Sequence, residues 1–471
     1  MHPAEITDLL RGDVTTDKRW PPEPVAESWE RIREHRRYYR NDPDELFSHR
    51  PELHVRDDAR ATADRQAEFT PAGLGREISK LSAALLFSEA PRLSVDGEVE
   101  QSALDALAES NDLPSTLHDG ADAVASEGVA GLRVLVDDDV LEGRPLISVE
   151  AGDSIIWSER YGHTEGGVLV VARKSEQTVW RLLEEHGKGY VRRRLYRGTE
   201  TRLGEAAGLS SGPAEWRDLR DEVRTGLSRP TLVKWSNLPG DDSDLRGIEA
   251  MLDSLDDATT LGRKKARASA PLVFVNRRLA EENGDADLGG AIFLDDSVSP
   301  IEKPEQLASV VQGSMQAADH QTYLSGLREQ AISAAGYSLA SWGLGEGGRA
   351  DSGRALRLRQ SRTLLTLAAK SRQAEGAIGE ILSIALEMIT GGVNEVSVEL
   401  GDGMPSDPLE LAQELDTLSD AGLISKEEAA KRLHPEFTEE QVAAEVAAIG
   451  SADRRSSLER ALNSGIGDLG D

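Results

Sequence analysis

The sequence of 471 residues contains no cysteine. This absence excludes disulfide bonds, thiolate catalysis and cysteine-ligated zinc. Aromatic residues make up only 4% of the chain, so we expect a core built mainly from leucine, valine, isoleucine and alanine. No apolar run approaches the roughly 20 residues of a membrane span. The first residues show no apolar stretch behind a basic start, which argues against a secretory signal.

Basic residues are scarce relative to acidic ones. Lys and Arg number 54 against 84 Asp and Glu, which gives a formal net charge of −30. Such a surface favours solubility and repels nucleic acid by default. With 38% hydrophobic and 29% charged residues, the composition predicts a folded protein. The length allows two or three domains.

Charge is segregated along the chain. Residues 258–280 contain no acid, and residues 341–375 carry seven bases against three acids. The tail from 395 to 471 carries eighteen acids against six bases. Segregation of this kind is expected where different segments meet different partners. The bases of the first segment are Arg263, Lys264, Lys265, Arg267, Arg277 and Arg278.

The first half of the chain predicts helices and then strands. Residues 71–86 place Leu74, Ile78, Leu81 and Leu85 at helical spacing on one face. From about residue 131 to 236, short runs rich in β-branched and aromatic residues predict an antiparallel sheet. We expect residues 198–217 to form a longer loop within it.

The second half predicts two helices around a small β element. The first begins at an N-cap, Ser243 or Asp244, and two short strands follow near Leu272 and Ile292. The second helix runs from Pro304, at a favoured first-turn position, to about Ala335. The apolar positions of the first helix are Ile248, Leu252, Leu255 and Leu261.

A glycine-rich stretch over residues 336–353 separates this element from a long helix over 354–389, which Gly391 and Gly392 end. A strand at 395–400 and an acidic helical tail, frayed after residue 453, complete the prediction. The expected apolar core of the tail is Leu423, Ile424, Leu433, Phe437, Val442, Val446 and Ile449.

Five segments, taken in their order and spacing, resemble those of a known protein family. They are Tyr38-Tyr39, SKLSAALLFSEAPRL (79–93), LISVEAGDSIIW (146–157), SDLRGIEAMLDSLDDA (243–258) and the glycine-rich stretch running into SGRALRLRQSR (352–362). Over most of residues 30–450 the chain resembles the portal (head–tail connector) proteins of tailed bacteriophages. The resemblance implies an α+β, multi-domain portal fold. Its expected parts are a wing over 1–240 (helices, then β-rich from about 131), stem helix 1 over 241–270, a clip over 271–302, stem helix 2 over 303–335, a channel (tunnel) loop over 336–353, a long wing helix with a return strand over 354–402, and an acidic helical crown over 403–471.

The resemblance also implies a function. Portal proteins form a ring, usually of twelve subunits, around a channel for double-stranded DNA at one capsid vertex. The expected partners are the major capsid protein, the scaffold, the terminase large subunit and a head–tail adaptor, with no membrane and no cofactor. Localisation would be the virion, after assembly in the host cytoplasm, and the chain would not be an enzyme. The alternatives are another minor structural protein of the capsid, or an unrecognised hydrolase or nuclease.

The glycine-rich stretch is the main candidate site. It lacks the Lys-Ser/Thr ending of a P-loop, so the alternatives are a plain surface loop and, by resemblance, the channel loop. The side chains assigned to that loop are Gly336, Trp342, Gly343, Glu346, Arg349, Asp351 and Gly353.

Two basic clusters are candidate contacts to DNA or to neighbouring subunits. We favour roles without DNA, because DNA must slide through a channel and each phosphate contact strengthens binding. These roles are subunit contacts for both clusters, docking to the clip for the first, and a solvated helix face for the second. The candidates are Arg263, Lys264, Lys265, Arg267, Arg354, Arg357 and Arg362. The nine histidines form no HExxH motif, and no GxSxG elbow occurs, so we nominate neither a metal site nor a catalytic residue.

Overall fold

The structure, a computed structural model, describes residues 19–56, 58–268, 272–276, 292–294, 308–311, 317–344, 357–401, 415–419, 421–433 and 442–448. The chain divides into two compact units, a large one of residues 1–349 and 356–403 and a small one of residues 350–355 and 404–471. Helices combine with mostly antiparallel sheets, which confirms the expected α+β class.

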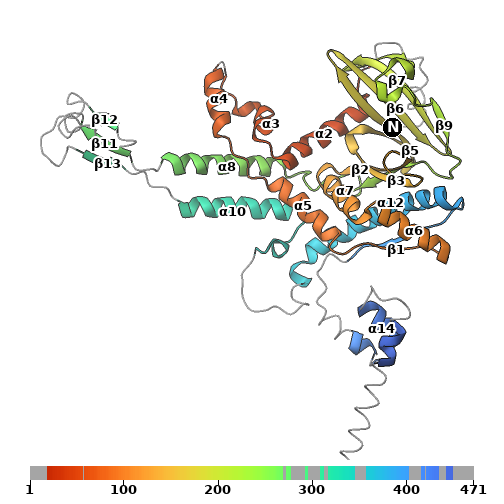
Figure 1. The fold of residues 1–471 in the computed structure, drawn as a ribbon. Helices are drawn as coiled ribbons and strands as arrows, with labels where there is room; N and C mark the ends of the chain where they lie inside the picture. The colour runs from red at the N-terminus through yellow and green to blue at the C-terminus, as the bar shows by residue number, and fades with distance from the viewer. Residues whose placement is uncertain are drawn as a thin grey trace, which may run out of the picture. The chain divides into compact units, whose positions relative to one another are not determined.

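Helices dominate the N-terminal part, as predicted (Figure 1). The side chains of Asp42 and Asp58 cap two of them by accepting hydrogen bonds from backbone N–H groups. The expected helix over 71–86 forms from Leu74, with Leu74 and Ile78 buried. The elements are α2 (Glu23–Arg40), α3 (Pro43–Ser48), η1 (Pro51–Leu53), α4 (Ala59–Glu68), α5 (Leu74–Leu86), β1 (Arg92–Ser94), α6 (Glu98–Ser110) and α7 (Leu113–Glu127).

The β-rich part contains two sheets where the sequence predicted one. A three-stranded sheet has the order β10-β2-β3, and a second has the order β4-β5-β6-β7-β8 with β9 on β7. The strands are β2 (Val129–Val136), β3 (Pro145–Ala151), β4 (Ile155–Arg160), β5 (His163–Ser175), β6 (Thr178–Gly187), β7 (Tyr190–Thr199), β8 (Arg202–Ala207), β9 (Glu222–Arg224) and β10 (Leu232–Ser236), with η2 (Gly152–Ser154), η3 (Leu209–Ser211) and η4 (Ala214–Trp216) between them.

The expectation of a longer loop over 198–217 holds for residues 208–217, which form no strand, and is wrong for the residues before them. Residues 202–207 form β8, which pairs antiparallel with β7 after an irregularity between Arg197 and Thr199. Leu203 points into the core and is fully buried. The alternation of the strand is hard to see in the sequence because the irregularity shifts its register and Gly204 interrupts it.

The second half of α12 (Ser361–Thr390) lies in the centre of the main core. Its Ile378, Ile381 and Leu382 are completely buried together with Leu104 and Trp235 from α6 and β10. Gly391, with φ of 73°, ends this helix as predicted. A single helical turn at 357–359 precedes α12, and the predicted start at residue 354 lies outside the described part. The predicted return strand is β14 (Ser397–Glu399), which pairs with β1.

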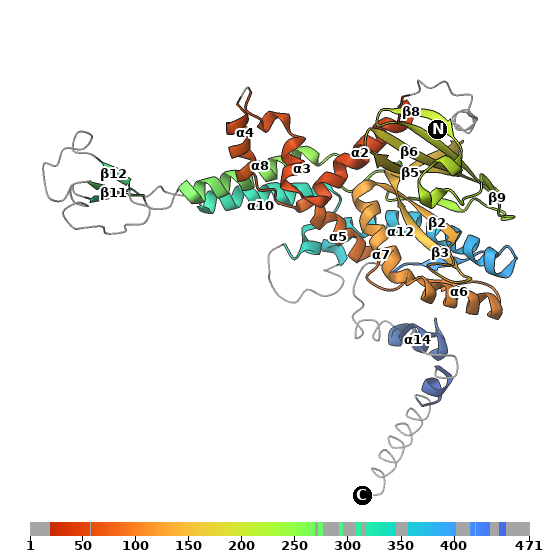
Figure 2. The same ribbon diagram turned by 45° about the horizontal axis from the view of Figure 1, so that its top comes forward.

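Helices α8 (Glu249–Ala268) and α10 (Ala317–Ala334) lie side by side in both ribbon views (Figures 1 and 2). Leu252 and Leu255 of α8 pack in one apolar cluster with Ala331 and Ile332 of α10. Leu261 was predicted to share this face, but its side chain is 47% exposed. It belongs to the last two turns, beyond the cluster that buries the first half of the helix.

The expected N-cap of the first helix is also wrong. Helix α8 begins at Glu249, five residues after Asp244. Gly247, with φ of +84°, lies between them in the left-handed region that an α-helix does not use. The residues 243 and 244 are therefore free to make other contacts.

Among the described residues, three short strands lie between the two helices in the chain. Strand β11 (Leu272–Asn276) pairs parallel with β12 (Ile292–Leu294) and antiparallel with β13 (Ala308–Val311). The two predicted strands are thus present, but β13 contradicts the helix predicted from Pro304. The β-branched pair Val310-Val311 suits a strand, and its pairing with β11 decides the conformation. The rest of the expected clip over 271–302 lies outside the described residues.

In the small unit the structure describes α14 (Lys426–Leu433) and helical residues 415–419 and 442–448. Leu415, Ala430 and Val442 are buried. Leu423, predicted for this core, is exposed instead, because it lies in the turn before α14. Phe437 and Ile449 are outside the described residues.

Candidate functional site at the root of the helix pair

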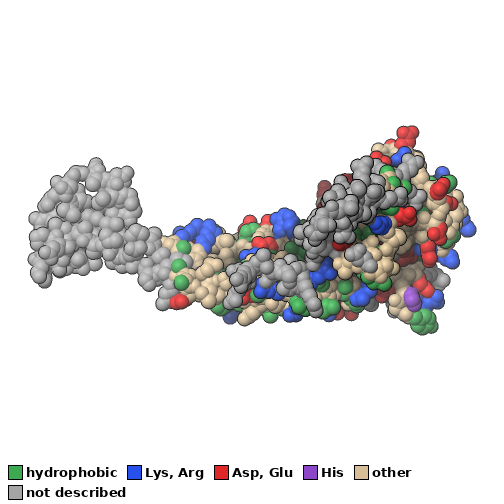
Figure 3. All heavy atoms as spheres, turned by 90° about the horizontal axis from the view of Figure 1, so that it is seen from below, with side chains coloured by type: hydrophobic (Ala, Val, Ile, Leu, Met, Phe, Trp, Pro, Cys, Tyr) green, Lys and Arg blue, Asp and Glu red, His purple; other side chains and the backbone are tan. Residues whose placement is uncertain are grey.

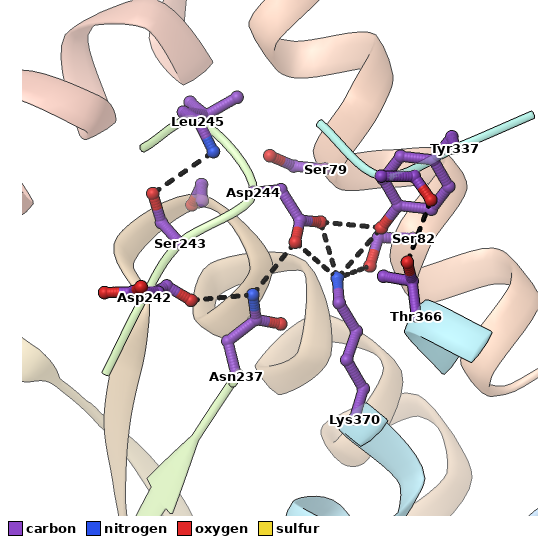
Figure 4. A network of polar contacts seen from close by, with 12 residues as sticks. Ser79, Ser82, Asn237, Asp242, Ser243, Asp244, Leu245, Tyr337, Thr366 and Lys370 are labelled. Atoms are coloured by element: carbon purple, nitrogen blue, oxygen red, sulfur yellow. Dashed lines mark hydrogen bonds and ion pairs between the residues drawn. The ribbon is translucent and has the colours of Figure 1, made fainter. Parts of the chain in front are cut away.

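Five polar residues meet where the helix pair joins the rest of the large unit, and we call this cluster the root. They come from four segments that are far apart in the sequence, and Figure 4 shows them pointing toward one another. Lys370 comes from α12, and Ser82 comes from α5. Asn237 and Asp244 flank the connection from β10 to α8, and Tyr337 follows α10.

Lys370 is the centre of the root. Its Nζ lies 2.5 and 2.6 Å from the two carboxylate oxygens of Asp244. It also donates to the Ser82 hydroxyl at 2.6 Å and the Tyr337 hydroxyl at 2.9 Å. The carboxylate of Asp244 accepts two more hydrogen bonds, from Tyr337 Oη at 2.8 Å and Asn237 Nδ2 at 2.9 Å. Each of the five residues therefore has at least one hydrogen-bond partner within the root.

The root is almost fully removed from water. The side chains of Lys370 and Asp244 are 2% and 0% exposed. Burial lowers the pKa of Lys370, against the opposing effect of Asp244. Burial and the same carboxylate raise the pKa of Tyr337 well above its ordinary value. A buried pair of this kind adds little net stability, but removing one partner costs about 3–5 kcal/mol because a charge is left buried alone.

The backbone around Gly128 places Asp244. Asn237 N donates to Gly128 O at 2.8 Å, and Asp244 N donates to Ala125 O at 2.9 Å. Gly128 ends α7 with φ of +90°, and a Cβ on it would lie 2.3 Å from Asp241 O. Only glycine fits there. The end of α7 thus holds the segment that leads from β10 into α8.

Helix α2 makes a second layer of contacts beside the root. His35 bridges Ser243 Oγ at 2.7 Å and Glu249 Oε1 at 3.0 Å, and so ties α2 to the start of α8. Arg36 binds Glu127 and Asp153, each at 2.7 Å. Against the effect of burial, hydrogen bonds from Arg36 and Arg33 lower the pKa of Asp153. Helix α2 therefore connects the helix pair to α7 and to η2.

The first half of the predicted channel loop is anchored to α12. Ser338 N donates to Thr363 Oγ1 at 2.9 Å, and Thr366 Oγ1 donates to Gly336 O at 2.8 Å. Residues Leu339–Trp342 form the 3-10 helix η6. Arg328 of α10 lies over the Trp342 ring, 5.7 Å from its centroid. Gly343 follows with φ of +66°.

Of the predicted loop residues, the structure thus places Gly336 next to Tyr337 of the root, and Trp342 and Gly343 at the end of η6. The remaining four lie outside the described residues, as does Arg354 from the second basic cluster. They are Glu346, Arg349, Asp351 and Gly353.

The first basic cluster lies on the last two turns of α8, far from the root. Lys264 pairs with Glu68 at 2.8 Å, and Arg263 donates to Thr70 Oγ1. Lys265 and Arg267 are exposed. Figure 3 shows basic side chains gathered at this end of the helix pair. Arg357 and Arg362, from the second cluster, are exposed at the start of α12, so the structure does not bring the two clusters together.

Sequence reasoning missed the root. Lys370 lies in a buried stripe of α12 with Leu367, Ala374 and Ala377. A lysine within an apolar stripe is the signal that could have found it. Asp244 gave no such signal, because Ser243 and Asp244 also suit a helix N-cap.

Neither a metal centre nor a membrane span is found in the described part of the chain. None of its groups of His, Asp and Glu could hold a metal ion. Each of its helices is too short or too polar to span a bilayer.

Comparison with known proteins gives one family. The family model described as "Phage portal protein, SPP1 Gp6-like" matches residues 25–456. No curated protein matches the chain. Among solved structures, the chain is similar to one described as "Neck of empty GTA particle computed with C6 symmetry", at 13% identity and a TM-score of 0.42. That match covers 80% of this chain and 94% of the other.

Proposed function

The chain belongs to the SPP1 Gp6-like family of phage portal proteins, and we propose that its copies form a ring around a channel for double-stranded DNA at one capsid vertex. The ring would serve genome packaging, retention and ejection. The family and the helix pair support this proposal: two helices lie side by side, with short strands joining them in the chain (Figure 1).

The proposed parts follow the observed elements. Helices α8 and α10 would be the stem, and the strands β11, β12 and β13 would belong to the clip. The wing would comprise the N-terminal helices, the two larger sheets and α12. The small unit would be the crown. In this division the clip takes in residues 308–311, which the sequence had assigned to the second stem helix.

The root gives the stem a fixed attachment. Asp244 lies five residues before α8, Tyr337 lies three residues after α10, and Lys370 of α12 binds both. Because these contacts are buried, the stem and the first half of the predicted loop, residues 336–344, are held to the same point of α12. The channel-loop role of residues 336–353 stays a prediction, and this anchored base supports it.

We propose a structural role without catalysis. In the ring, the acidic surface would keep DNA from adhering to the channel wall, and a separate terminase motor would hydrolyse ATP. The same ring would contact the major capsid protein, the scaffold and a head–tail adaptor.

Electron microscopy of the purified full chain tests the proposal. We expect closed rings of about a dozen subunits with an axial hole, and no ATP hydrolysis or nuclease activity by the protein alone. A protein that stays monomeric at high concentration would contradict the ring. Metal-dependent DNA cleavage that a single Asp or Glu substitution abolishes would contradict the structural role.

A further inference from the structure

Two exposed helix faces of the large unit carry opposite charge. The first is the outer face of α6, where Glu98, Asp105 and Glu109 are exposed and recur at helical spacing on one side. Val99, on the flank of this face, is 76% exposed. We call this the acidic face. No Lys or Arg occurs anywhere between Leu93 and Leu132, so the acids have no basic neighbour along their own helices.

The second face lies at the start of α12. Arg362, Leu365 and Arg372 are exposed on one side of this helix, with Leu365 74% exposed. Leu358, in the preceding helical turn, is 70% exposed. We call this the basic face. Exposed apolar side chains that gather in one place with a polar rim mark an interaction surface, and Leu358 and Leu365 lie near one another in the chain beside these arginines.

Within the part of the chain that the structure describes, neither face is neutralised. Among the described residues, Arg362 and Arg372 form no ion pair, and Glu98 and Glu109 form none either. Asp105 binds only the neutral amide of Gln101, at 2.8 Å. The opposite face of α6 buries Leu104 and Leu107 in the main core with α12. The acidic face therefore points away from the core that both helices share.

We infer that the basic face of one subunit docks on the acidic face of the next copy around the ring. The inference rests on the proposed ring and names the surfaces that close it. The charges match in spacing: at 1.5 Å per residue, Glu98 and Glu109 lie about 16 Å apart along their helix, and Arg362 and Arg372 about 15 Å apart. Two different surfaces of one chain that bind each other form a heterologous contact, the kind that generates rings.

Charge reversal tests the contact. One variant of the full chain carries Arg362→Glu and Arg372→Glu, and a second carries Glu98→Lys and Glu109→Lys. Each alone places like charges opposite each other at every interface, and we expect each to remain monomeric at a concentration where the wild type forms rings. All four positions are exposed, so unchanged circular dichroism and unfolding temperature should show that both variants fold.

Mixing the two variants is the decisive measurement. In a 1:1 mixture, every contact of an alternating ring again joins opposite charges, so rings of even subunit number should return by light scattering and electron microscopy. A chain with all four substitutions should also assemble alone. The inference is overturned if either single-face variant assembles like the wild type, or if neither combination restores rings.

The outcomes also separate this inference from the proposed function. Wild-type protein that forms no ring contradicts both. Wild-type rings together with normal assembly of the α6 variant contradict the inference alone. In that case, if only the variant with Arg362→Glu and Arg372→Glu fails to assemble, the basic face binds another acidic surface, such as the C-terminal unit.

Discussion

The lysines found near the two ends of helix α8 lie in opposite surroundings. At the root, the ammonium of Lys370 from α12 is surrounded by Asp244, Ser82 and Tyr337 and is almost fully removed from water. At the far end, Lys264 pairs with Glu68 while both side chains stay well exposed, and Lys265 is exposed. The chemistry of the side chain is the same, and the surroundings decide its role.

A buried charge fixes geometry, because it tolerates no position other than the one in which all its partners are present. An exposed charge contributes little to stability, because water replaces its partner at small cost. We therefore expect changes at the root to affect folding and the placement of the helix pair. Changes at the far end should affect only contacts with other molecules.

Replacing Lys370 with Met should have the largest effect. The substitution leaves the Asp244 carboxylate buried without its cation, and we expect the free energy of unfolding to fall by about 3–5 kcal/mol. Denaturant unfolding of the purified variant measures this. A loss below about 0.5 kcal/mol would show that the pair is dispensable and that the root does not anchor the stem.

A second substitution sharpens that result. Adding Asp244→Asn to Lys370→Met removes the uncompensated charge while keeping an acceptor for Tyr337 and Asn237. We expect the double variant to be more stable than Lys370→Met alone. If the double variant instead loses as much unfolding free energy, relative to the wild type, as the Lys370→Met and Asp244→Asn variants lose together, the two side chains do not interact. That result would contradict the role given to the buried pair.

Asp256 lies between the two ends of α8 and gives a pH-dependent effect. Its buried carboxylate accepts a hydrogen bond from Ala72 N at 2.7 Å. Burial raises the pKa of Asp256 from 3.8 to about 7, with Asp253 and Asp257 adding to the rise and Arg50 opposing it. Between these two pKa values the folded protein keeps a proton that the unfolded chain releases, so stability falls as pH rises from about 4 to about 7.

The variant Asp256→Asn removes this dependence. At pH 4 its stability should be close to that of the wild type, because both side chains are neutral. At pH 8 it should be more stable by about 1–3 kcal/mol. Unfolding temperatures of both proteins across this pH range give the difference. If the two proteins show the same dependence of unfolding temperature on pH, the pKa of Asp256 is not raised.

A substitution at Gly336 tests whether the first half of the predicted loop is anchored to α12. It has φ of +95°, and a Cβ there would lie 2.9 Å from Thr366 Oγ1. Gly336→Ala should cost about 1–2 kcal/mol. Gly326→Ala in α10, where a Cβ meets nothing within 4 Å, is the matched control and should stabilise slightly. Equal unfolding midpoints for the two variants would contradict an anchored base.

Periodic apolar patterns predicted the regular elements well. The spacing of Ile248, Leu252 and Leu255 predicted the buried face of the first helix of the pair, and these residues are buried. The runs of β-branched residues predicted most strands of the two larger sheets. These patterns succeed because the period of a helix or a strand is a local property of the chain.

Long-range contacts could not be predicted in the same way. Asp244 satisfied every local rule for a helix N-cap, but it binds Lys370, 126 residues away. Residues 308–311 followed a proline that favours a helix start, but pairing with β11 made them a strand. In both places a tertiary partner overrides local preference. The root was therefore missed even though the helices that it joins were found.

The smallest effect on stability should come from Lys265→Met at the far end of α8, the counterpart of Lys370→Met. Lys265 is exposed, so we expect a change in unfolding free energy below about 0.5 kcal/mol.

The reversal of Lys265 and Arg267 to Glu then separates their two candidate partners. If these bases contact DNA, the negative slope of log affinity against log salt should decrease in magnitude by about 2, one for each lost phosphate contact. We expect an unchanged slope, because these bases leave DNA free to slide. We also expect rings that dissociate at lower salt, because the bases contact neighbouring subunits.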